Sequence, residues 1–231
     1  MITKKIERYF QGKLLLLIPL LLINLNLSSQ GVQFGLYAEP LVSWFSSDTE
    51  LTVNDGARPG FSYGLAIDAY FAENYAFSTG INITNASGRL NYNDTLQIKF
   101  KNSETELYPD QNIVYKIQYL CVPLGIKLKT NQIGYMTFFA NTGMKPKIVI
   151  GSKGNIPALD IENESLDEEL RLFNLGYHIG AGMEYSLGGK TAIVIGLDYE
   201  DNFLDITKDR EGQPGDKIRH HIIRFRLGLN F

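Results

Sequence analysis

The sequence has few of the residues on which several protein classes depend. Its 231 residues hold a single Cys, which excludes a disulfide framework, and its 22 Gly follow no collagen-like period. The 44% hydrophobic content excludes a disordered chain, and a mean hydropathy of −0.10 excludes a polytopic helical membrane protein. The net charge of −3 argues against a nucleic-acid partner, because such domains carry a basic patch or a high pI.

Residues 1–29 predict a secretory signal peptide. Lys4, Lys5 and Arg8 make a basic start, residues 14–25 form an apolar run, and Ser29 supplies a small residue at its end. A transmembrane anchor is the weaker alternative, since the run has about 12 residues and a spanning helix needs about 20. We therefore expect an exported protein whose mature domain is residues 30–231.

Beyond residue 30, apolar residues recur at every second position, a period that predicts β-strands with two unlike faces. The first segment places Val32, Phe34 and Leu36 on one face and Gln33 and Gly35 on the other. Eight segments of this kind follow one another along the chain. Their connections alternate between short (72–75, 130–134, 188–190) and long (46–60, 84–112, 151–171, 204–218).

This alternation is typical of a bacterial outer-membrane barrel, with short periplasmic turns and long extracellular loops. A soluble barrel such as a lipocalin is the alternative, because period two alone does not assign the two faces. Glycines in the polar set suit a crowded barrel interior, and large aromatics near segment ends, such as Trp44 and Tyr75, suit interface girdles. The sequence thus predicts an all-β, eight-stranded antiparallel up-and-down transmembrane β-barrel in a Gram-negative outer membrane, with both mature termini in the periplasm.

The last strand carries a further signal. It places Leu227, Leu229 and Phe231 at alternate positions and ends on the aromatic residue. This pattern resembles the C-terminal insertion signal by which the barrel assembly machinery accepts its substrates. We expect Phe231 to act in this way, with that machinery as a partner during biogenesis and outer-membrane lipid around the folded barrel.

Parity also assigns charged residues to the interior. An eight-stranded barrel is just wide enough for side chains to fill it, so acids and bases should pair there and leave no continuous water channel. We expect Arg224 and Arg226 on the last strand to lie between Glu39 and Asp198 on its neighbours, with bidentate contacts to carboxylates. The predicted structural network comprises Glu39, Asp68, Lys127, Lys145, Glu184, Asp198, Arg224 and Arg226, with Lys129 and Glu200 also inside.

Candidates for chemistry are few. His178 is predicted inward, and the adjacent His220 and His221 should point to opposite faces of the last strand. Outer-membrane barrels that cleave or transfer acyl chains pair a His with a Ser, and no Ser is predicted beside these histidines. We therefore expect no catalytic, cofactor-binding or metal-binding residue and a non-enzymatic barrel. The alternative, a barrel acting on lipid or binding a small ligand, requires a His within hydrogen-bond reach of a Ser or carboxylate at the outer rim.

The 84–112 connection keeps an alternating pattern on both arms. Leu90 and Tyr92 lead out, and Ile113, Tyr115 and Ile117 lead back. Strands three and four should therefore continue past the membrane as a projecting hairpin. Such an arm either stabilises the barrel rim or offers a surface to an envelope protein.

Two segments carry a family resemblance. Residues 117–129 read IQYLCVPLGIKLK and residues 176–185 read GYHIGAGMEY. They resemble the PorT-like outer-membrane β-barrel family, in which a Tyr-Leu-Glu-x-Pro-Leu-like strand and a Gly-rich strand ending in Glu-Tyr recur. This chain has Cys121 where the family commonly has Glu. The resemblance implies a barrel that serves as a structural or interaction subunit of a cell-envelope or protein-secretion complex.

Overall fold

The computed structural model describes residues 31–49, 52–93, 95–100, 104–109, 111–208 and 217–231. The predicted signal peptide lies outside these residues, and within them no helix is long and apolar enough to cross a membrane. The elements are β1 (Val32–Ser47), β2 (Thr52–Ala72), β3 (Tyr75–Tyr92), β4 (Leu96–Lys99), β5 (Glu104–Leu107), β6 (Asn112–Cys121), β7 (Leu124–Lys129), β8 (Met136–Ile156), the short 3-10 helix η1 (Pro157–Leu159), β9 (Ile161–Ser165), β10 (Phe173–Gly188), β11 (Thr191–Asn202) and β12 (Ile218–Asn230).

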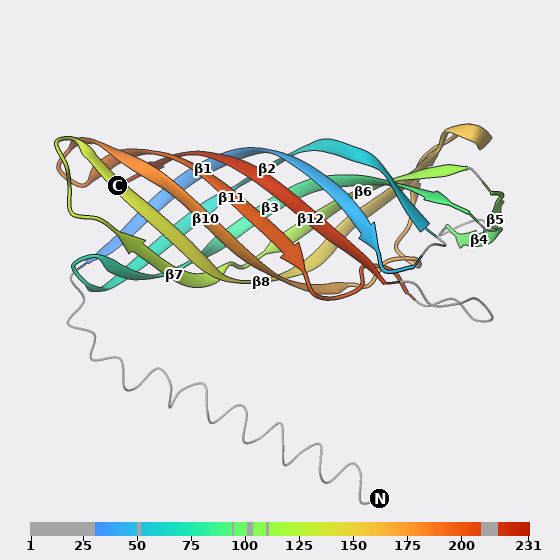
Figure 1. The fold of residues 1–231 in the computed structure, drawn as a ribbon, viewed down its shortest axis with the longest axis horizontal. Coiled ribbons are helices and arrows are strands. Elements are labelled where there is room, and N and C mark those ends of the chain that lie inside the picture. The colour runs from blue at the N-terminus through green and yellow to red at the C-terminus, as the bar shows by residue number, and fades with distance from the viewer. Residues whose placement is uncertain (1–30, 50–51, 94, 101–103, 110, 209–216) are drawn as a thin grey trace, which may run out of the picture.

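The strands close into a ring (Figure 1). Each strand pairs antiparallel with its neighbours in the order β1, β2, β3, β6 with β7, β8, β10, β11 and β12, and β12 pairs with β1. Strands β6 and β7 share one position, because Val122 and Pro123 interrupt the ladder and proline has no N–H to donate. The predicted eight-stranded antiparallel barrel is confirmed.

The two ends of the barrel differ. One end, the turn end, holds the short connections 73–74, 130–135 and 189–190, and both β1 and β12 reach it (Figure 1). There the Phe34 N–H donates to the Phe231 carbonyl at 3.1 Å, and the Phe231 N–H donates back at 2.8 Å. The opposite end, the loop end, carries the small β4–β5 sheet and β9, which pairs with β8.

The long loops predicted from the sequence are shorter in the structure. Strand β2 begins at Thr52, inside the predicted loop 46–60, and β8 runs to Ile156, inside 151–171. Strands β3 and β6 stay paired as far as Asn91 and Asn112, so both arms of the predicted projecting hairpin extend into 84–112, and β4 and β5 pair with each other between them. The fourth loop, 204–218, is described only at its two ends.

The loops were overestimated because the polarity of the two faces reverses along long strands such as β3. On β3, Phe77 and Ile81 are exposed on the outer face, whereas further up Asn85 and Arg89 occupy that face. The inner face changes in the opposite sense, from polar residues to the fully buried Leu90. We call the outer surface nearer the turn end the apolar band. The part of the barrel between this band and the loop end is the head. The apolar band includes Leu36, Tyr63, Leu65, Ile81, Leu124, Leu197, Ile223 and Phe225.

The head has its own hydrophobic core, as a water-soluble β-barrel does. Phe45 is fully buried there, with its ring edge-on to Tyr115 at 5.8 Å between centroids. A Cβ on Gly88 would lie within 3.0 Å of the Phe45 ring, so glycine is required beneath it. The core also contains Leu41, Ala86, Leu90, Tyr92, Ile98, Phe100, Leu107, Ile113, Ile117, Tyr119, Cys121, Ile156, Leu166, Leu170, Ile206, Ile218 and Ile222.

Candidate functional site

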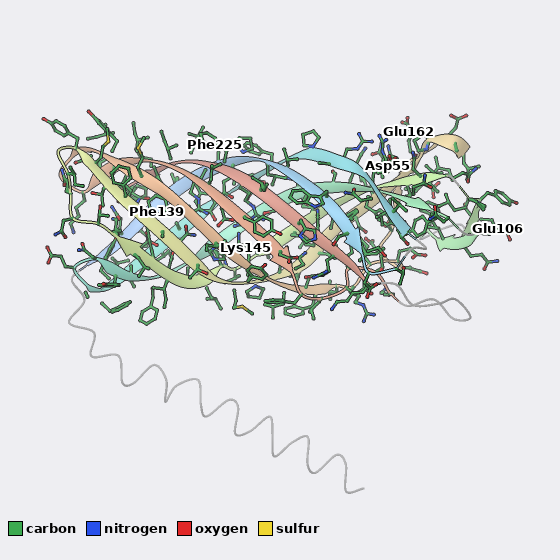
Figure 2. All side chains as sticks on the ribbon, in the orientation of Figure 1. Asp55, Glu106, Phe139, Lys145, Glu162 and Phe225 are labelled. Carbon is green, nitrogen blue, oxygen red and sulfur yellow. The ribbon has the colours of Figure 1, made fainter. Side chains whose placement is uncertain are left out.

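The interior below the head holds a group of charged side chains that we call the central cluster (Figure 2 labels its Lys145). Arg224 lies in its middle and is 0% exposed. Its Nη1 is 3.0 Å from Asp198 Oδ1, its Nη2 is 2.6 Å from Glu200 Oε2, and its Nε is 3.8 Å from Glu39 Oε2. The guanidinium therefore divides its nitrogens among separate carboxylates, which differs from the predicted bidentate pairing.

The strand register places these groups together at the barrel seam. Arg224 on β12 lies directly opposite Leu41 on β1 and Asp198 on β11, and all three side chains point into the barrel. Arg226, two residues closer to the turn end, brings Nε within 2.6 Å of Glu39 Oε1 and stacks over the Tyr37 ring at 4.5 Å. The cluster thus ties the first strand to the last through side chains as well as through the backbone ladder.

Two lysines of β8 complete the central cluster. Lys145 Nζ lies 3.1 Å from Glu200 Oε2 and 3.5 Å from Asp198 Oδ1. Lys147 also forms an ion pair with Glu200 and is fully buried, with its ammonium 4.8 Å from the Tyr119 ring centroid. Lys147 was not among the predicted interior residues, although it has the same parity as Lys145 and lies on β8, which continues to Ile156.

A second group, the lower cluster, lies nearer the turn end. Lys127 Nζ contacts Asp68 Oδ2 at 2.6 Å and Glu184 Oε1 at 2.8 Å. Lys129 Nζ contacts Glu184 Oε2 at 2.6 Å, and the Asn230 amide donates to Glu184 Oε1 at 3.0 Å. All predicted network residues are therefore in ion pairs, divided between two clusters rather than joined in one.

The ring of Phe139 lies between the two clusters. Lys127 Nζ is 4.9 Å from its centroid, and a Cβ on Gly182 would be 2.6 Å from its outer carbon. A cavity of about 20 Å³ between the clusters has room for about one water molecule. Side chains thus fill the interior from the lower cluster to the core of the head.

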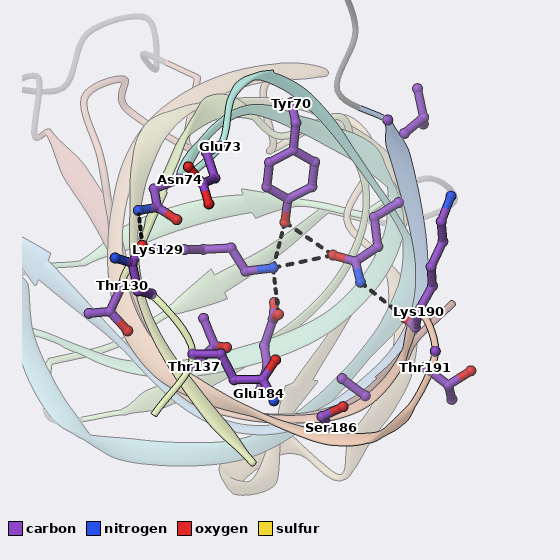
Figure 3. A pocket seen from close by; sticks show the side chains of 17 residues that line it. Tyr70, Glu73, Asn74, Lys129, Thr130, Thr137, Glu184, Ser186, Lys190 and Thr191 are labelled. Atoms are coloured by element: carbon purple, nitrogen blue, oxygen red, sulfur yellow. Dashed lines mark hydrogen bonds and ion pairs between the residues drawn. The ribbon is translucent and has the colours of Figure 1, made fainter. Parts of the chain in front are cut away.

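A polar pocket of about 460 Å³ opens at the turn end (Figure 3). Lys129 forms its floor, donating to the Tyr70 hydroxyl at 2.6 Å while it pairs with Glu184. The Tyr70 hydroxyl donates to Gln33 Oε1 at 3.1 Å, and Gln33 Nε2 donates to the Lys190 carbonyl at 3.3 Å. The pocket is therefore blind, because these bonded side chains cross the lumen.

The three histidines lie in three environments. His178 points inward, with Nδ1 3.0 Å from Asp198 Oδ2 in the central cluster. His220 is fully buried in the head, with Nδ1 3.2 Å from the Tyr119 hydroxyl. His221 faces outward, and its Nε2 lies 2.7 Å from Ser46 Oγ, so the prediction that no Ser lies beside a histidine was wrong. The sequence placed Ser46 in the predicted loop 46–60 and not on a strand face, whereas β1 runs to Ser47.

The sequence matches a known family. Residues 24–211 match the model of the outer membrane protein beta-barrel domain. No curated protein matches the chain.

Solved structures of outer-membrane proteins are similar to the chain at low identity. Neisserial surface protein A (NspA) is 10% identical, with 88% of this chain and 97% of that chain covered and a TM-score of 0.48. OprG from Pseudomonas aeruginosa is 12% identical, with 87% and 95% covered and a TM-score of 0.41. The outer membrane protease OmpT from Escherichia coli is 8% identical, with 90% and 98% covered and a TM-score of 0.45.

Proposed function

The chain belongs to the outer membrane protein beta-barrel domain family, and on that premise we propose that it is a closed barrel that carries a rigid head outside the cell as a surface for a partner protein. The observation that carries the proposal is the packed core of the head, which makes the strands beyond the membrane a fixed platform. Among the described residues, side chains fill the interior below the head, so this part of the barrel offers no open channel.

The apolar band supports membrane placement. On β1 the outward apolar positions run from Val32 to Trp44. Twelve steps of about 3.3 Å along a strand tilted by about 40° span about 30 Å, the thickness of a bilayer's hydrocarbon core. The head lies beyond this distance and therefore stands in water.

Orientation follows from the two ends. Short turns of bacterial outer-membrane barrels face the periplasm, so the turn end with Val32 and Phe231 lies there and the head lies outside. The proposal includes removal of residues 1–29 as a signal peptide and recognition of Phe231 by the barrel assembly machinery.

The paired residues 85–91 of β3 and 112–118 of β6, which we call the β3–β6 arm, form the surface that we propose for the partner. Its outer face is polar and internally bonded: Gln118 donates to Asn85 at 2.8 Å, and Arg89 pairs with Asp55 at 3.2 Å. Such a preorganised polar face loses little conformational entropy on binding. The resemblance to PorT-like barrels suggests an envelope or protein-secretion complex as the setting.

Impermeant maleimide labelling tests the orientation. The native Cys121 is fully buried and should stay unlabelled. Lys153→Cys, at an exposed position of β8 in the head, should react in intact cells, whereas Asn131→Cys at the turn end should react only after lysis. The reverse labelling pattern would contradict the orientation.

Photo-crosslinking in living cells tests the partner surface. A photoreactive amino acid at Lys116, exposed on the outer face of β6, should give a discrete crosslinked product. The same residue at Asn131 serves as the control and should not give that product. If outward positions of the β3–β6 arm give no product, the platform role is wrong.

A further inference from the structure

A polar constellation on the outer surface of the barrel belongs to neither interior cluster. Ser46 on β1, His221 on β12 and Asp201 on β11 come from three adjacent strands and share the outward face. Ser46 Oγ lies 2.7 Å from His221 Nε2, and Asp201 Oδ1 lies 3.2 Å from His221 Nδ1. The order of nucleophile, imidazole and carboxylate is that of a serine-hydrolase triad, in which each group lies within reach of the next.

Neighbouring side chains fix the orientation of the imidazole. Trp44 stacks against it with 5.5 Å between centroids and 17° between planes, and the ring of Tyr199 is nearly parallel to it at 6.4 Å. The Tyr199 hydroxyl lies 3.1 Å from Nδ1, and the Tyr177 hydroxyl donates to the second oxygen of Asp201 at 3.4 Å. A rigid ring with both nitrogens engaged is the preorganisation that acid–base catalysis requires.

The carboxylate selects the tautomer that catalysis needs. The hydrogen-bond partner of His221 Nδ1 is the Tyr199 hydroxyl, and Asp201 Oδ1 lies 3.2 Å from Nδ1 without a hydrogen bond to it. The negative charge of an ionised Asp201 at this distance favours the proton of a neutral His221 on Nδ1. Nε2 then carries a lone pair directed at the Ser46 hydroxyl. In this state the imidazole accepts the hydroxyl proton as the oxygen attacks.

The site lies at the upper boundary of the apolar band. Directly below it on the same strands, Val42 and Ile223 are each 45% exposed on the outer face. Directly above it are polar residues, with Arg219 opposite Ser46 in the β1–β12 register. A lipid beside this surface would lay its acyl chains along the apolar band and hold its ester carbonyl, which lies between chain and headgroup, at the height of Ser46.

We propose that Ser46, His221 and Asp201 hydrolyse a fatty acyl ester of an outer-membrane lipid, with Arg219 stabilising the oxyanion. This activity goes beyond the platform role and takes from it only the placement of the head outside the cell.

The reaction balances with water as the second reactant. Ser46 Oγ attacks the carbonyl carbon while its proton passes to His221 Nε2, and the C–O bond to the alcohol breaks as Nε2 protonates the leaving oxygen. Water then attacks the acyl-serine, gives a proton to Nε2, and releases the fatty acid as Ser46 regains its proton. One ester and one water yield one acid and one alcohol.

The test measures fatty acid released by the purified full chain in mixed micelles. One set of micelles contains phosphatidylethanolamine and a second contains lipopolysaccharide, so that release from one set identifies the lipid source. We expect Ser46→Ala and His221→Gln to lower the rate at least about 1,000-fold. Asp201→Asn should lower it about 10-fold or more, because the Tyr199 hydroxyl remains as an acceptor for the Nδ1 proton.

The matched control is Ser47→Ala, since Ser47 is the next residue along β1 and hydrogen-bonds Thr49 instead of His221. It should keep the unaltered rate. A fluorophosphonate should label Ser46, as located by mass spectrometry, and all variants should keep the heat-modifiable gel mobility of a folded barrel. Two results would each overturn the proposal: no release from either lipid, or an unaltered rate in Ser46→Ala. Micelles expose every face of the barrel, so such a failure would leave the orientation and platform proposals unaffected.

Discussion

Replacing Arg224 by Met should destabilise the barrel far more than the same replacement at Arg89. Both arginines pair with carboxylates, but Arg224 is 0% exposed whereas Arg89 and its partner Asp55 are 32% and 39% exposed. Methionine retains most of the side-chain volume, so the comparison isolates the charge. Both variants lose one cation and gain the same residue.

The magnitude follows from the partners that are left behind. Removing one member of a buried ion pair costs about 3–5 kcal/mol, because the remaining charge has no water to solvate it. Lys145 stays within 3.5 Å of Asp198 and within 3.1 Å of Glu200, so part of the charge remains compensated. We therefore expect about 3 kcal/mol for Arg224→Met and about 0–1 kcal/mol for Arg89→Met.

Reversible urea unfolding in lipid vesicles measures this difference. Trp44 is the single Trp and lies at the edge of the apolar band, so its fluorescence reports the transition. The free energy of unfolding is the midpoint multiplied by the slope, and the slope should be unchanged. The double variant Arg224→Met/Glu200→Gln should lose more stability than Arg224→Met alone, because it also removes the carboxylate that pairs with the buried Lys147. Equal midpoint shifts for the two single variants would refute the account of the interior.

Three further experiments test the faces and the packing. Leu124→Arg, in the apolar band, should lower the free energy of unfolding by about 2–4 kcal/mol. Gln118→Arg, on the outer face of the head, should lower it by less than about 1 kcal/mol. Equal losses in vesicle unfolding would mean that the band is misplaced. Gly182→Ala should lower the thermal midpoint, because a Cβ there would lie 2.6 Å from the Phe139 ring. Gly151→Ala should leave the midpoint unchanged, because the nearest atom to its Cβ would be 3.8 Å away. Phe45→Ala should cost about 3–5 kcal/mol and make the head sensitive to protease in intact cells; an unchanged cleavage pattern would contradict the packed head.

Period-two alternation predicted the strands and the inward charges because a β-strand offers a side chain only two faces. Once the signal peptide and the connections favoured an outer-membrane barrel, parity alone placed Glu39, Asp198 and Arg224 inside. Which of them meet is decided by the register between strands, which depends on backbone pairing that a single sequence does not specify. This is why the division into two clusters was not predicted.

The head was harder to recognise because its polarity is reversed. Ala86, Gly88 and Leu90 continue the inward positions of β3. In a membrane barrel apolar residues are expected on the outer, lipid-facing side, so their inward position in the head does not follow from the pattern. The outward site was missed for a related reason. Ser46 and His221 are 175 residues apart, and only the closure of β1 against β12 brings them together.

Ion conductance across a planar bilayer tests the central claim, that side chains fill the barrel from end to end. The bonded floor at Lys129, the two charge clusters and the core of the head each cross the lumen. We predict that the purified, folded full-length barrel produces no steady conductance above that of the bare bilayer. Long-lived conductance steps that depend linearly on voltage would show an open aqueous path and contradict the account.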